Sequence, residues 1–279
     1  MKRVALLLIF VAGLLKLSAQ EPIRPVSSAY MIEAGSSQLA DTYLSPMKYG
    51  GWSAALAYER MQAMRFDPEN WVMQLAIRGE VDRALNNLGN VATWRANISA
   101  RWAMMHRWRQ LAPGLTLAVG GATGIEGGCF YNTRNGNNPA SAKAAWTIDA
   151  TAFAAYNFRL GKLPLTLRYQ AVLPVIGVFF SPQYDELYYE IYLGNHSGLA
   201  HCAWFGSRFA MTNLLTVDMH FGATSLRMGY RNEILSSKVA NIVTRATTHA
   251  FVLGIAHEWL SLSRRTAPST DARIISALY

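Results

Sequence analysis

The sequence of 279 residues contains little charge, since Asp, Glu, Lys and Arg together make up 15% of it. Soluble globular domains usually carry roughly 25%. Only two cysteines are present, too few for a disulfide-stapled scaffold. A disordered chain combines low hydrophobicity with high net charge, whereas 51% of these residues are hydrophobic. These shortages exclude disorder and a small disulfide-rich fold, and the length allows one large domain or two small ones.

Long apolar runs are also missing, because after residue 19 none reaches the roughly 18 residues that a transmembrane helix requires. Residues 1–19 differ from the rest. Lys2 and Arg3 precede an apolar run at 4–15, and Ser18 and Ala19 supply small residues for cleavage. This layout is typical of a secretory signal peptide. We expect cleavage after Ala19; an uncleaved N-terminal anchor is the alternative.

The basic charge is not concentrated anywhere. The formal net charge is +9 for the full sequence, and residues 1–19 contain three bases and no acid. No block of five like charges and no nucleic-acid-binding module is visible. The composition therefore predicts no nucleic-acid partner, while scattered bases suit contact with anionic lipid headgroups.

Hydrophobic residues alternate with polar ones over long stretches. In 91–104 every second residue is apolar, from Ala92 through Trp94 and Ile98 to Met104, and the residues between them are mostly polar. The same alternation runs through 71–82, 146–158 and 165–173, and more weakly through 249–258. A period of two over this length predicts long strands with one apolar face. Helix is the competing interpretation for the Ala-rich stretch 140–155.

The length of these stretches decides between two all-β architectures. Soluble strands usually have 3–10 residues, and a strand that crosses a bilayer needs about 9–11. A soluble β-sandwich hides its apolar face, whereas a membrane barrel turns that face to lipid and its polar face inward. Strand length, the signal peptide and low charge favour a transmembrane antiparallel up-and-down β-barrel of about 12 strands. We expect these strands near 27–35, 51–64, 70–82, 91–105, 114–127, 144–158, 164–176, 186–194, 200–210, 213–222, 224–233 and 246–259.

The connections differ in length. Longer ones rich in Gly, Asn, Ser and Pro lie at 36–50, 83–90, 128–143, 177–185 and 234–245, and mostly shorter ones lie at 65–69, 106–113, 159–163, 195–199 and 223. Long extracellular loops and short periplasmic turns are the asymmetry expected of an outer-membrane barrel. We therefore predict a barrel over 20–259 and a C-terminal tail over 260–279 on the periplasmic side. Aromatic girdles at both membrane interfaces would contain Trp52, Trp71, Trp102, Trp146, Tyr156, Phe158 and Trp259.

The polar faces of these strands would line a narrow lumen. The charged and polar candidates for this lumen are Arg78, Glu80, Arg95, Arg101, Asp149, Arg168 and Glu190, and Asp82, Arg227 and Arg231 share the same predicted face. Buried charges need partners, so one interpretation is a structural network of ion pairs. The other is a selectivity filter for a small anionic solute.

Residues suited to catalysis are few. His196 and Ser197 are neighbours in a predicted turn, and Asp218 and His220 share a strand face. The six histidines are dispersed, without the spacing of a metal site. We assign no catalytic residue, no metal and no cofactor. Cys129 and Cys202 give no reason to predict a disulfide. Two glycine pairs, Gly120–Gly121 and Gly127–Gly128, indicate strand kinks or bulges.

Several short motifs extend over about residues 27–259. They are Asp41-Thr42-Tyr43-Leu44-Ser45-Pro46 with Tyr49 and Gly51, Ser181-Pro182 with Tyr184, Tyr188-Tyr189-Glu190-Ile191, and Leu226-Arg227-Met228-Gly229-Tyr230-Arg231. On these motifs the chain resembles an uncharacterised family of secreted proteins from Bacteroides-type bacteria, classed as a domain of unknown function. The resemblance implies an outer-membrane β-barrel and no assigned activity, so no catalytic residue is carried over.

Together these observations predict a protein of the outer membrane of a Gram-negative bacterium, with membrane lipid as its partner. Its role would be structural, at the cell surface, or that of a narrow passive channel with a small solute in the lumen. An outer-membrane hydrolase and a soluble periplasmic β-sandwich binding protein are the alternatives. An enzyme is the less favoured class.

Overall fold

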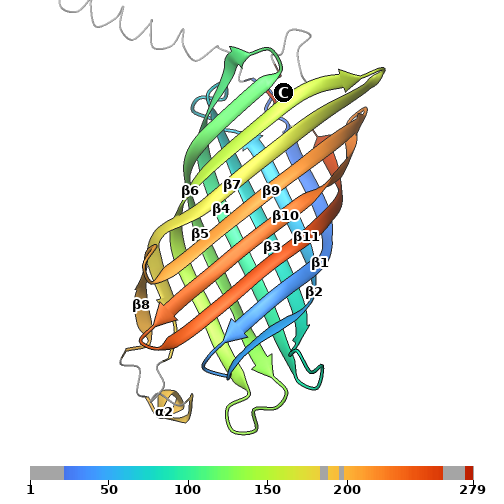
Figure 1. Ribbon diagram of the computed structural model, residues 1–279. Helices are drawn as coiled ribbons and strands as arrows, with labels where there is room; N and C mark the ends of the chain where they lie inside the picture. The colour runs from blue at the N-terminus through green and yellow to red at the C-terminus, as the bar shows by residue number, and fades with distance from the viewer. Residues whose placement is uncertain (1–21, 183–187, 195–197, 260–273, 279) are drawn as a thin grey trace, which may run out of the picture.

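Ten long strands form a closed antiparallel barrel (Figure 1). The computed structural model describes residues 22–182, 188–194, 198–259 and 274–278, so the predicted signal peptide at 1–19 lies outside the described residues. The barrel strands are β1 (Val26–Asp41), β2 (Ser45–Ala63), β3 (Trp71–Leu85), β4 (Ala92–Ala112), β5 (Leu115–Asn132), β6 (Ala140–Leu160), β7 (Leu163–Phe180), β9 (Arg208–Phe221), β10 (Thr224–Val239) and β11 (Ile242–Trp259). Within the described part of the chain, no helix is long and apolar enough to cross a membrane.

Neighbouring strands in the ring are mostly neighbours in the sequence. The ring closes where β1 pairs with β11, from Val26 opposite Trp259 to Asp41 opposite Thr244. On the other side β6 pairs with β7, and β7 also pairs with β9. Short β8 (Ala200–Ala203) pairs with the end of β7, beside the ring. The predicted up-and-down antiparallel barrel is confirmed. The helical alternative for 140–155 is wrong, because these residues form β6.

The outer face of the barrel is apolar and exposed. Along β11 burial alternates strictly, with Val252 and Ala250 buried inside and Phe251 and Ile255 both 58% exposed outside. The other strands expose a similar set, including Tyr30, Ile32, Leu56, Ile98, Val119, Ile125, Ile148, Ile176 and Leu215. Apolar exposure on this scale is the surface that lipid covers in a transmembrane barrel. The soluble β-sandwich alternative is wrong, because a sandwich buries this face between two sheets.

Aromatic side chains gather at both ends of this outer face. Trp52 and Trp94, near one end, meet edge to face with ring centroids 6.0 Å apart. At the other end His106 lies between Trp71 and Trp108, with centroid distances of 5.2 and 4.6 Å. The predicted girdle residues Trp52, Trp102, Trp146, Tyr156, Phe158 and Trp259 are all exposed on the outside. Rings near the strand ends suit the two membrane–water interfaces, whereas Trp102 is the middle residue of β4 and does not lie at an end.

The predicted difference between long and short connections is much reduced. At one end the strands are joined by 64–70, 113–114, 161–162 and 222–223, and at the other end by 42–44, 86–91, 133–139, 181–207 and 240–241. Only 181–207 is a long connection. The strands continue into the predicted loops, as at Ser36 and Gln38, which are exposed polar residues of β1. In the turn 64–70, the Asn70 side chain hydrogen-bonds Asp67 and holds the pKa of its carboxyl below the usual range.

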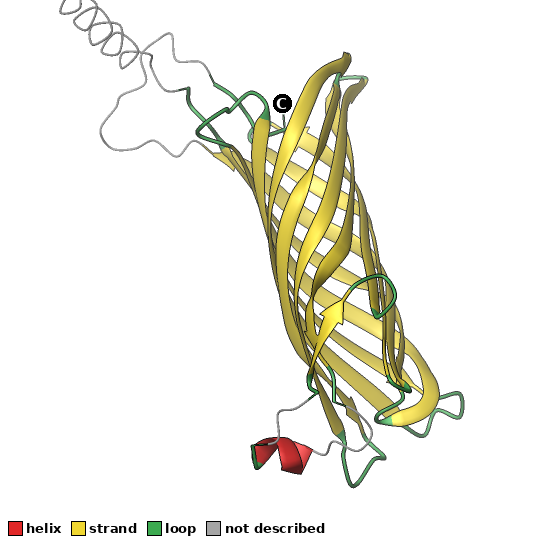
Figure 2. Ribbon diagram, turned by 90° about the vertical axis from the view of Figure 1, so that its left-hand side faces the viewer, coloured by secondary structure: helices red, strands yellow, loops and turns green. Residues whose placement is uncertain are grey.

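Two of the twelve predicted strands do not join the ring. Within the predicted strand 186–194, Tyr188–Tyr192 forms the short helix α2, and Figure 2 shows it beyond one end of the barrel. The predicted strand 200–210 is reduced to β8, which ends at Ala203. Both segments belong to the connection 181–207. These two segments lie outside the ring and have few neighbouring strands to pair with. Residues that favour strands are therefore not sufficient to form a long strand here.

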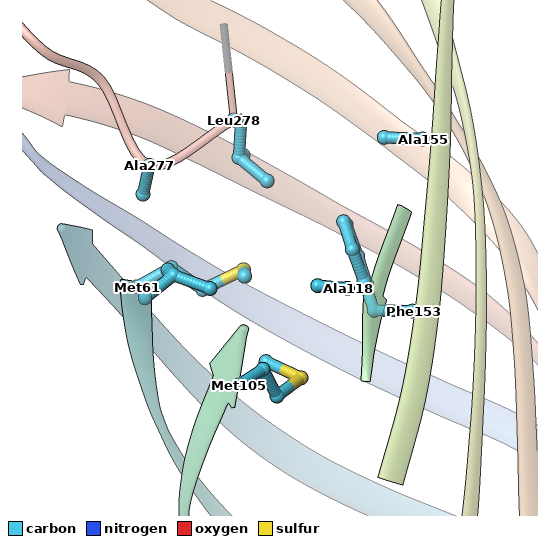
Figure 3. Packing of buried hydrophobic residues seen from close by; sticks show 8 residues of the cluster. Met61, Met105, Ala118, Phe153, Ala155, Ala277 and Leu278 are labelled. Atoms are coloured by element: carbon cyan, nitrogen blue, oxygen red, sulfur yellow. The ribbon is translucent and has the colours of Figure 1, made fainter. Parts of the chain in front are cut away.

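A segment of the C-terminal tail fills the mouth of the barrel at the end opposite α2 (Figure 1). Ala277 and Leu278 are buried and pack in a cluster with Met61, Val72, Met105, Ala118, Phe153 and Ala155 (Figure 3). The guanidinium of Arg107, 1% exposed, donates hydrogen bonds to the carbonyl oxygens of Ser276 at 2.7 Å and Ala277 at 2.6 Å. Residues 274–278 are therefore part of the inner packing of the barrel.

Placing a charge on the outer face tests whether lipid covers it. Leu56 of β2 is 68% exposed and Leu88 in the connection 86–91 is 82% exposed. We expect Leu56→Arg to lower the free energy of unfolding in lipid vesicles by about 2–4 kcal/mol, because it places a charge in the bilayer. Leu88→Arg should change it by less than about 0.5 kcal/mol. Denaturant titration measures both values, and equally small effects would mean that water surrounds the barrel.

Candidate functional site

The candidate site is the charged interior of the barrel, where the polar faces of the strands meet. Arg78 of β3 is surrounded by three carboxylates: its Nε lies 2.9 Å from Glu33, and its two terminal nitrogens lie 2.9 Å from Glu80 and 3.1 Å from Glu233. We call the connected set the Arg78 network, which consists of Glu33, Arg78, Glu80, Asp82, Arg95, Arg231 and Glu233. Three cations thus neutralise most of the charge of four acids.

The other members of the Arg78 network link it to two further strands. Arg231 of β10 binds Glu33 at 2.8 Å, and Arg95 of β4 contacts both Glu80 and Asp82. Ser53 of β2 donates a hydrogen bond to Glu80 at 3.3 Å. Charge-assisted hydrogen bonds of this kind compensate the cost of burying both partners only when most polar atoms are satisfied. The network therefore fixes the inner faces of β1, β2, β3, β4 and β10 relative to one another.

A second set, the Arg227 network, lies nearer the end occupied by the tail and consists of Glu59, Arg168, Asp218 and Arg227. Arg227 binds Asp218 in a bidentate pair with two distances of 2.7 Å. Arg227 also binds Glu59 at 2.9 Å, and Arg168 binds the other Glu59 oxygen at 2.5 Å. Two cations and two acids balance here. Planar guanidinium groups suit such two-point contact with carboxylates.

Several contacts cross the lumen from one side to the other. Glu59 lies on β2 and Arg168 on β7, which are five strands apart in both directions round the ring. Asp41 and Lys143, 2.9 Å apart, likewise join the opposite strands β1 and β6. A further bridge, Gln74–Gln170, joins β3 and β7 with an N–O distance of 2.9 Å. Two cavities of about 80 and 90 Å³ remain within the lumen.

Apolar clusters lie near both ends of the charged interior. The cluster of Figure 3, which includes Leu278 of the tail, lies at one mouth. Near the other mouth Leu39, Leu44, Tyr49, Ala84, Val91, Phe130 and Ala246 pack together. Side chains that exclude water lower the local dielectric constant, which strengthens paired charges and penalises unpaired ones. The ion pairs of the lumen therefore depend on one another.

The predicted lumen residues fall into different parts of this interior. Arg78, Glu80 and Arg95 belong to the Arg78 network and Arg168 to the Arg227 network. Arg101 and Asp149 form a separate pair at 2.7 Å. Gly124 of β5 makes room for that pair, because a Cβ there would lie 3.1 Å from the Asp149 carboxylate and 3.6 Å from Arg101 Nε.

Glu190 requires a correction. It was predicted on a strand facing the lumen, but it lies in helix α2 within the connection 181–207. A residue in this connection is not part of the barrel wall. The alternation of strand faces assumed for Tyr188, Tyr189 and Glu190 therefore does not apply, and Glu190 is not assigned to the lumen.

The sequence reasoning missed three acids that complete the networks: Glu33, Glu59 and Glu233. They lie on β1, β2 and β10. Glu33 and Glu59 each stand inside a largely apolar stretch, between Ile32 and Ala34 and after Leu56, Ala57 and Tyr58. A single carboxylate in a membrane-crossing strand has to face the lumen. That rule was a usable signal for both residues.

His220 takes part in a hydrogen-bonded relay at the mouth near the tail. Its Nδ1 lies 2.6 Å from Ser225 Oγ and its Nε2 lies 2.7 Å from Thr166 Oγ1, which donates to Asn157 at 2.6 Å. A cavity of about 460 Å³ is lined by Thr166 and His220. Ser225 is buried and does not line this cavity. A serine beside a histidine is the pattern of a nucleophile and base, but this hydroxyl is buried and does not face the cavity that His220 lines.

The other candidates for chemistry remain separate. Asp218 pairs with Arg168 and Arg227, and Ser197 lies outside the described residues. Cys129 and Cys202 are both free and exposed. Within the described ranges, no group of three His, Cys, Asp or Glu residues could hold a metal ion. At Gly120 of β5 the neighbouring strand β4 leaves no room for a side chain, because a Cβ there would lie 2.1 Å from the Met104 carbonyl oxygen.

Comparison with known proteins identifies a family but no activity. The model of a family described as "Protein of unknown function (DUF3316)" matches residues 4–266, which confirms the predicted membership of a family of unknown function. No curated protein matches.

Among solved structures, the outer membrane protease OmpT from Escherichia coli is 7% identical, with 86% of this chain and 98% of that chain covered and a TM-score of 0.45. The β domain of the Bordetella autotransporter BrkA is 8% identical, with coverage of 84% and 100% and a TM-score of 0.41. An outer membrane channel from Pseudomonas putida F1 is 10% identical, with coverage of 85% and 96% and a TM-score of 0.34. Likenesses this weak transfer no activity to this chain.

Removing the central cation tests how far the lumen charges depend on one another. We expect Arg78→Met to lower the free energy of unfolding by about 3–5 kcal/mol, because it leaves four buried acids with only two cations, Arg95 and Arg231. The matched variant is Arg83→Met, since Arg83 of the same strand lies outside, over the Trp94 ring at 5.7 Å. This variant should cost about 0.5–1 kcal/mol. Equal losses in a denaturant titration would show that the Arg78 network contributes little.

Proposed function

We propose, for a chain that belongs to the family described as "Protein of unknown function (DUF3316)", a role as an outer-membrane β-barrel with a closed lumen. The barrel would act as a structural or surface protein and not as an open passage. One observation carries this proposal: side chains on opposite strands bind each other across the lumen, as Glu59 and Arg168 do.

The outer face supports a location in the outer membrane of a Gram-negative bacterium. Single-chain barrels with an apolar outer band and aromatic girdles are outer-membrane proteins, and the predicted signal peptide at 1–19 would direct export. The short turns and the tail at 260–279 would then face the periplasm, where residues 274–278 close the mouth. The barrel domain would extend over 20–259 in the mature chain, surrounded by membrane lipid.

The interior supports a lumen that does not conduct. A passive channel needs a continuous path of water through its length. Here Asp41–Lys143, Gln74–Gln170 and Glu59–Arg168 bridge the lumen at different positions. Separating such partners would leave buried polar groups unsatisfied, which costs several kcal/mol for charges. A narrow channel for a small solute is the alternative, and its guest would have to fit cavities of about 80–90 Å³.

The connection 181–207 supports a role at the cell surface. Its helix α2 lies beyond the barrel at the end opposite the tail (Figures 1 and 2). Tyr192 is 85% exposed, Trp204 57% and Phe205 49%. In the proposed orientation Tyr192 of α2 lies on the outside of the cell, whereas Trp204 and Phe205 follow β8, which runs back along the end of β7. Exposed aromatic rings are common contact residues in protein recognition, which favours a surface or adhesive role.

Cell fractionation tests the proposed location. We expect the protein in the outer-membrane fraction, with electrophoretic mobility that changes on heating because the closed barrel withstands mild detergent. A periplasmic protein released by osmotic shock is the control in the same cells. Release of this chain together with that control would overturn the membrane location.

Conductance measurements test the closed lumen. Purified, folded protein added to planar bilayers should give no steady current steps, whereas a general porin in the same membranes provides the positive control. Heat-dependent mobility verifies that the added protein is folded. Regular steps with a defined ion selectivity would contradict the proposal and favour the channel alternative.

A further inference from the structure

The hydrogen-bonded wall of the barrel is interrupted between β7 and β9. The ladder between these two strands ends where Val172 is opposite Thr212. Beyond that point residues 173–176 of β7 and 208–211 of β9 do not pair with each other, and on that side no described strand takes the place of β9. Pairing on this edge of β7 resumes at Gly177, which is opposite β8. We call the stretch between 173–176 and 208–211 the β7–β9 break.

The local sequence explains why the ladder stops there. Pro174 of β7 lies within the unpaired stretch and has no backbone N–H to donate. On its other side, the pairing of β7 with β6 skips Val175, and a bulge of this kind bends a strand. Residues 208–211 of β9 stay paired with β10. The two strands therefore diverge at the break, while each remains attached to its other neighbour.

The break opens onto the apolar outer face. Val175 and Ile176 of β7 are 40% and 52% exposed there. Trp146 of β6, one of the predicted girdle residues, is opposite Val178, two residues further towards the end with α2. The break therefore lies just inside the girdle, within the apolar band. Lipid chains offer no hydrogen bonds to unpaired strand edges, so polar groups on the lumen side are the partners available to them.

A cavity of the lumen touches both edges of the break. It is the cavity of about 80 Å³, which we call the Arg101 cavity, and it is lined by Pro174 on the β7 side and by Ala210 and Met211 on the β9 side. A single water needs about 10–15 Å³ of such space. The Arg101 cavity therefore has room for a group of several heavy atoms next to the break.

The β4 side of the Arg101 cavity offers hydrogen-bond donors that are not in use. Arg101 binds Asp149 through Nε, its side chain is 25% exposed, and its two terminal nitrogens bond to no atom of the described chain. Asn97 and Ser99 line the same cavity, and their side chains also lack a hydrogen-bond partner within the described ranges. These three residues have the same inward orientation on β4, because alternate residues of a strand share a face.

The charged residues of the Arg101 cavity favour an anion. They comprise four cations and two carboxylates, namely Arg95, Arg101, Lys143, Arg208, Glu126 and Glu233. All four cations have a carboxylate partner, but the partners of Arg95, Arg101 and Lys143 do not line the cavity. The cavity therefore presents mainly the donor side of these pairs. Guanidinium N–H groups suit the oxygens of a carboxylate or another oxyanion.

We propose that the Arg101 cavity binds a single-chain anionic amphiphile that enters from the membrane through the β7–β9 break. The inference rests on the proposed membrane location and needs no conducting lumen. The anionic head accepts hydrogen bonds from the terminal nitrogens of Arg101 and from Asn97. The hydrocarbon chain passes between Pro174 and Met211 and lies in the lipid, because the charged lumen offers it no apolar surroundings.

Native mass spectrometry of the folded protein in a neutral detergent tests the site, with dodecanoate as the probe. We expect one saturable adduct per chain. Dodecanol has the same chain without the charge, and acetate has the charge without the chain, so both should bind much more weakly. Equal binding of dodecanol would overturn the anionic head site. Equal binding of acetate would overturn entry from the membrane, because a small anion would then reach the cavity by another route.

A pair of variants on one strand tests the entrance. Met211→Trp should weaken dodecanoate binding roughly tenfold, because a larger side chain fills the space that the hydrocarbon chain needs. Met219→Trp is the matched control and should bind as the wild type does. Met219 shares the face of Met211 but lies where β9 is paired with both β7 and β10. Equal binding by the two variants would overturn the assigned entrance.

Two further readouts separate this inference from the proposed location. Heat-dependent mobility verifies that each variant is folded before binding is measured. A protein that fractionates with the outer membrane and binds no dodecanoate overturns the amphiphile site alone. A protein that is released by osmotic shock overturns the proposed location and the site together.

Discussion

Closure of the sheet is the constraint on which the rest of the structure depends. Lipid offers no hydrogen bonds to a backbone, so a β-protein in a membrane can leave no open strand edge. Here β1 meets β11 over its whole length, from Val26 opposite Trp259 to Asp41 opposite Thr244. Once the ring is closed, the period of two in each strand divides the side chains into an outer apolar set and an inner polar set.

The inner side chains include many charged groups, which have to be buried inside the ring, whereas the outer side chains are mostly apolar. Most of the enclosed charged side chains are buried, among them Glu33, Glu59 and Arg227, and apolar clusters lie near both mouths. Charges in such surroundings must neutralise one another. The Arg78 and Arg227 networks do so with contacts between strands far apart in the sequence, such as Glu33–Arg231 and Glu59–Arg168. Tight pairing inside is therefore a consequence of closure and of the apolar clusters together.

How much the sequence could predict depends on the surroundings of each residue. The sequence reasoning placed all ten strands of the ring, and alternation marked five of them, because lipid on one side and the lumen on the other impose opposite polarity. It failed at strand ends such as Ser36 and Gln38, where the outer side chains are polar and the pattern disappears although the ladder continues. It also failed at 186–194, where aromatic, strand-favouring residues form helix α2 away from the wall.

The interior was less predictable than the wall. The alternation of side chains between the two faces of each strand was enough to predict which charged residues face the lumen. These are Arg78, Glu80, Arg95, Arg101, Asp149 and Arg168. Their partners depend on register and on which strands stand opposite, and neither can be read from a single strand. Glu33 and Glu59 illustrate this, since each pairs with arginines on strands that are not its neighbours. The tail could not be foreseen either, because Arg107 binds carbonyl oxygens of a segment about 170 residues further along the chain.

The same rules give polar residues opposite meanings on the two faces. Inside the ring a charged side chain is expected, and its partner is another side chain of the same barrel. On the outer face an amide or imidazole has no solvent to bind it, so a polar residue there costs free energy unless something outside the barrel meets it. Asn213, Asn232 and His249 bind Tyr169, Tyr230 and one another, which reduces that cost.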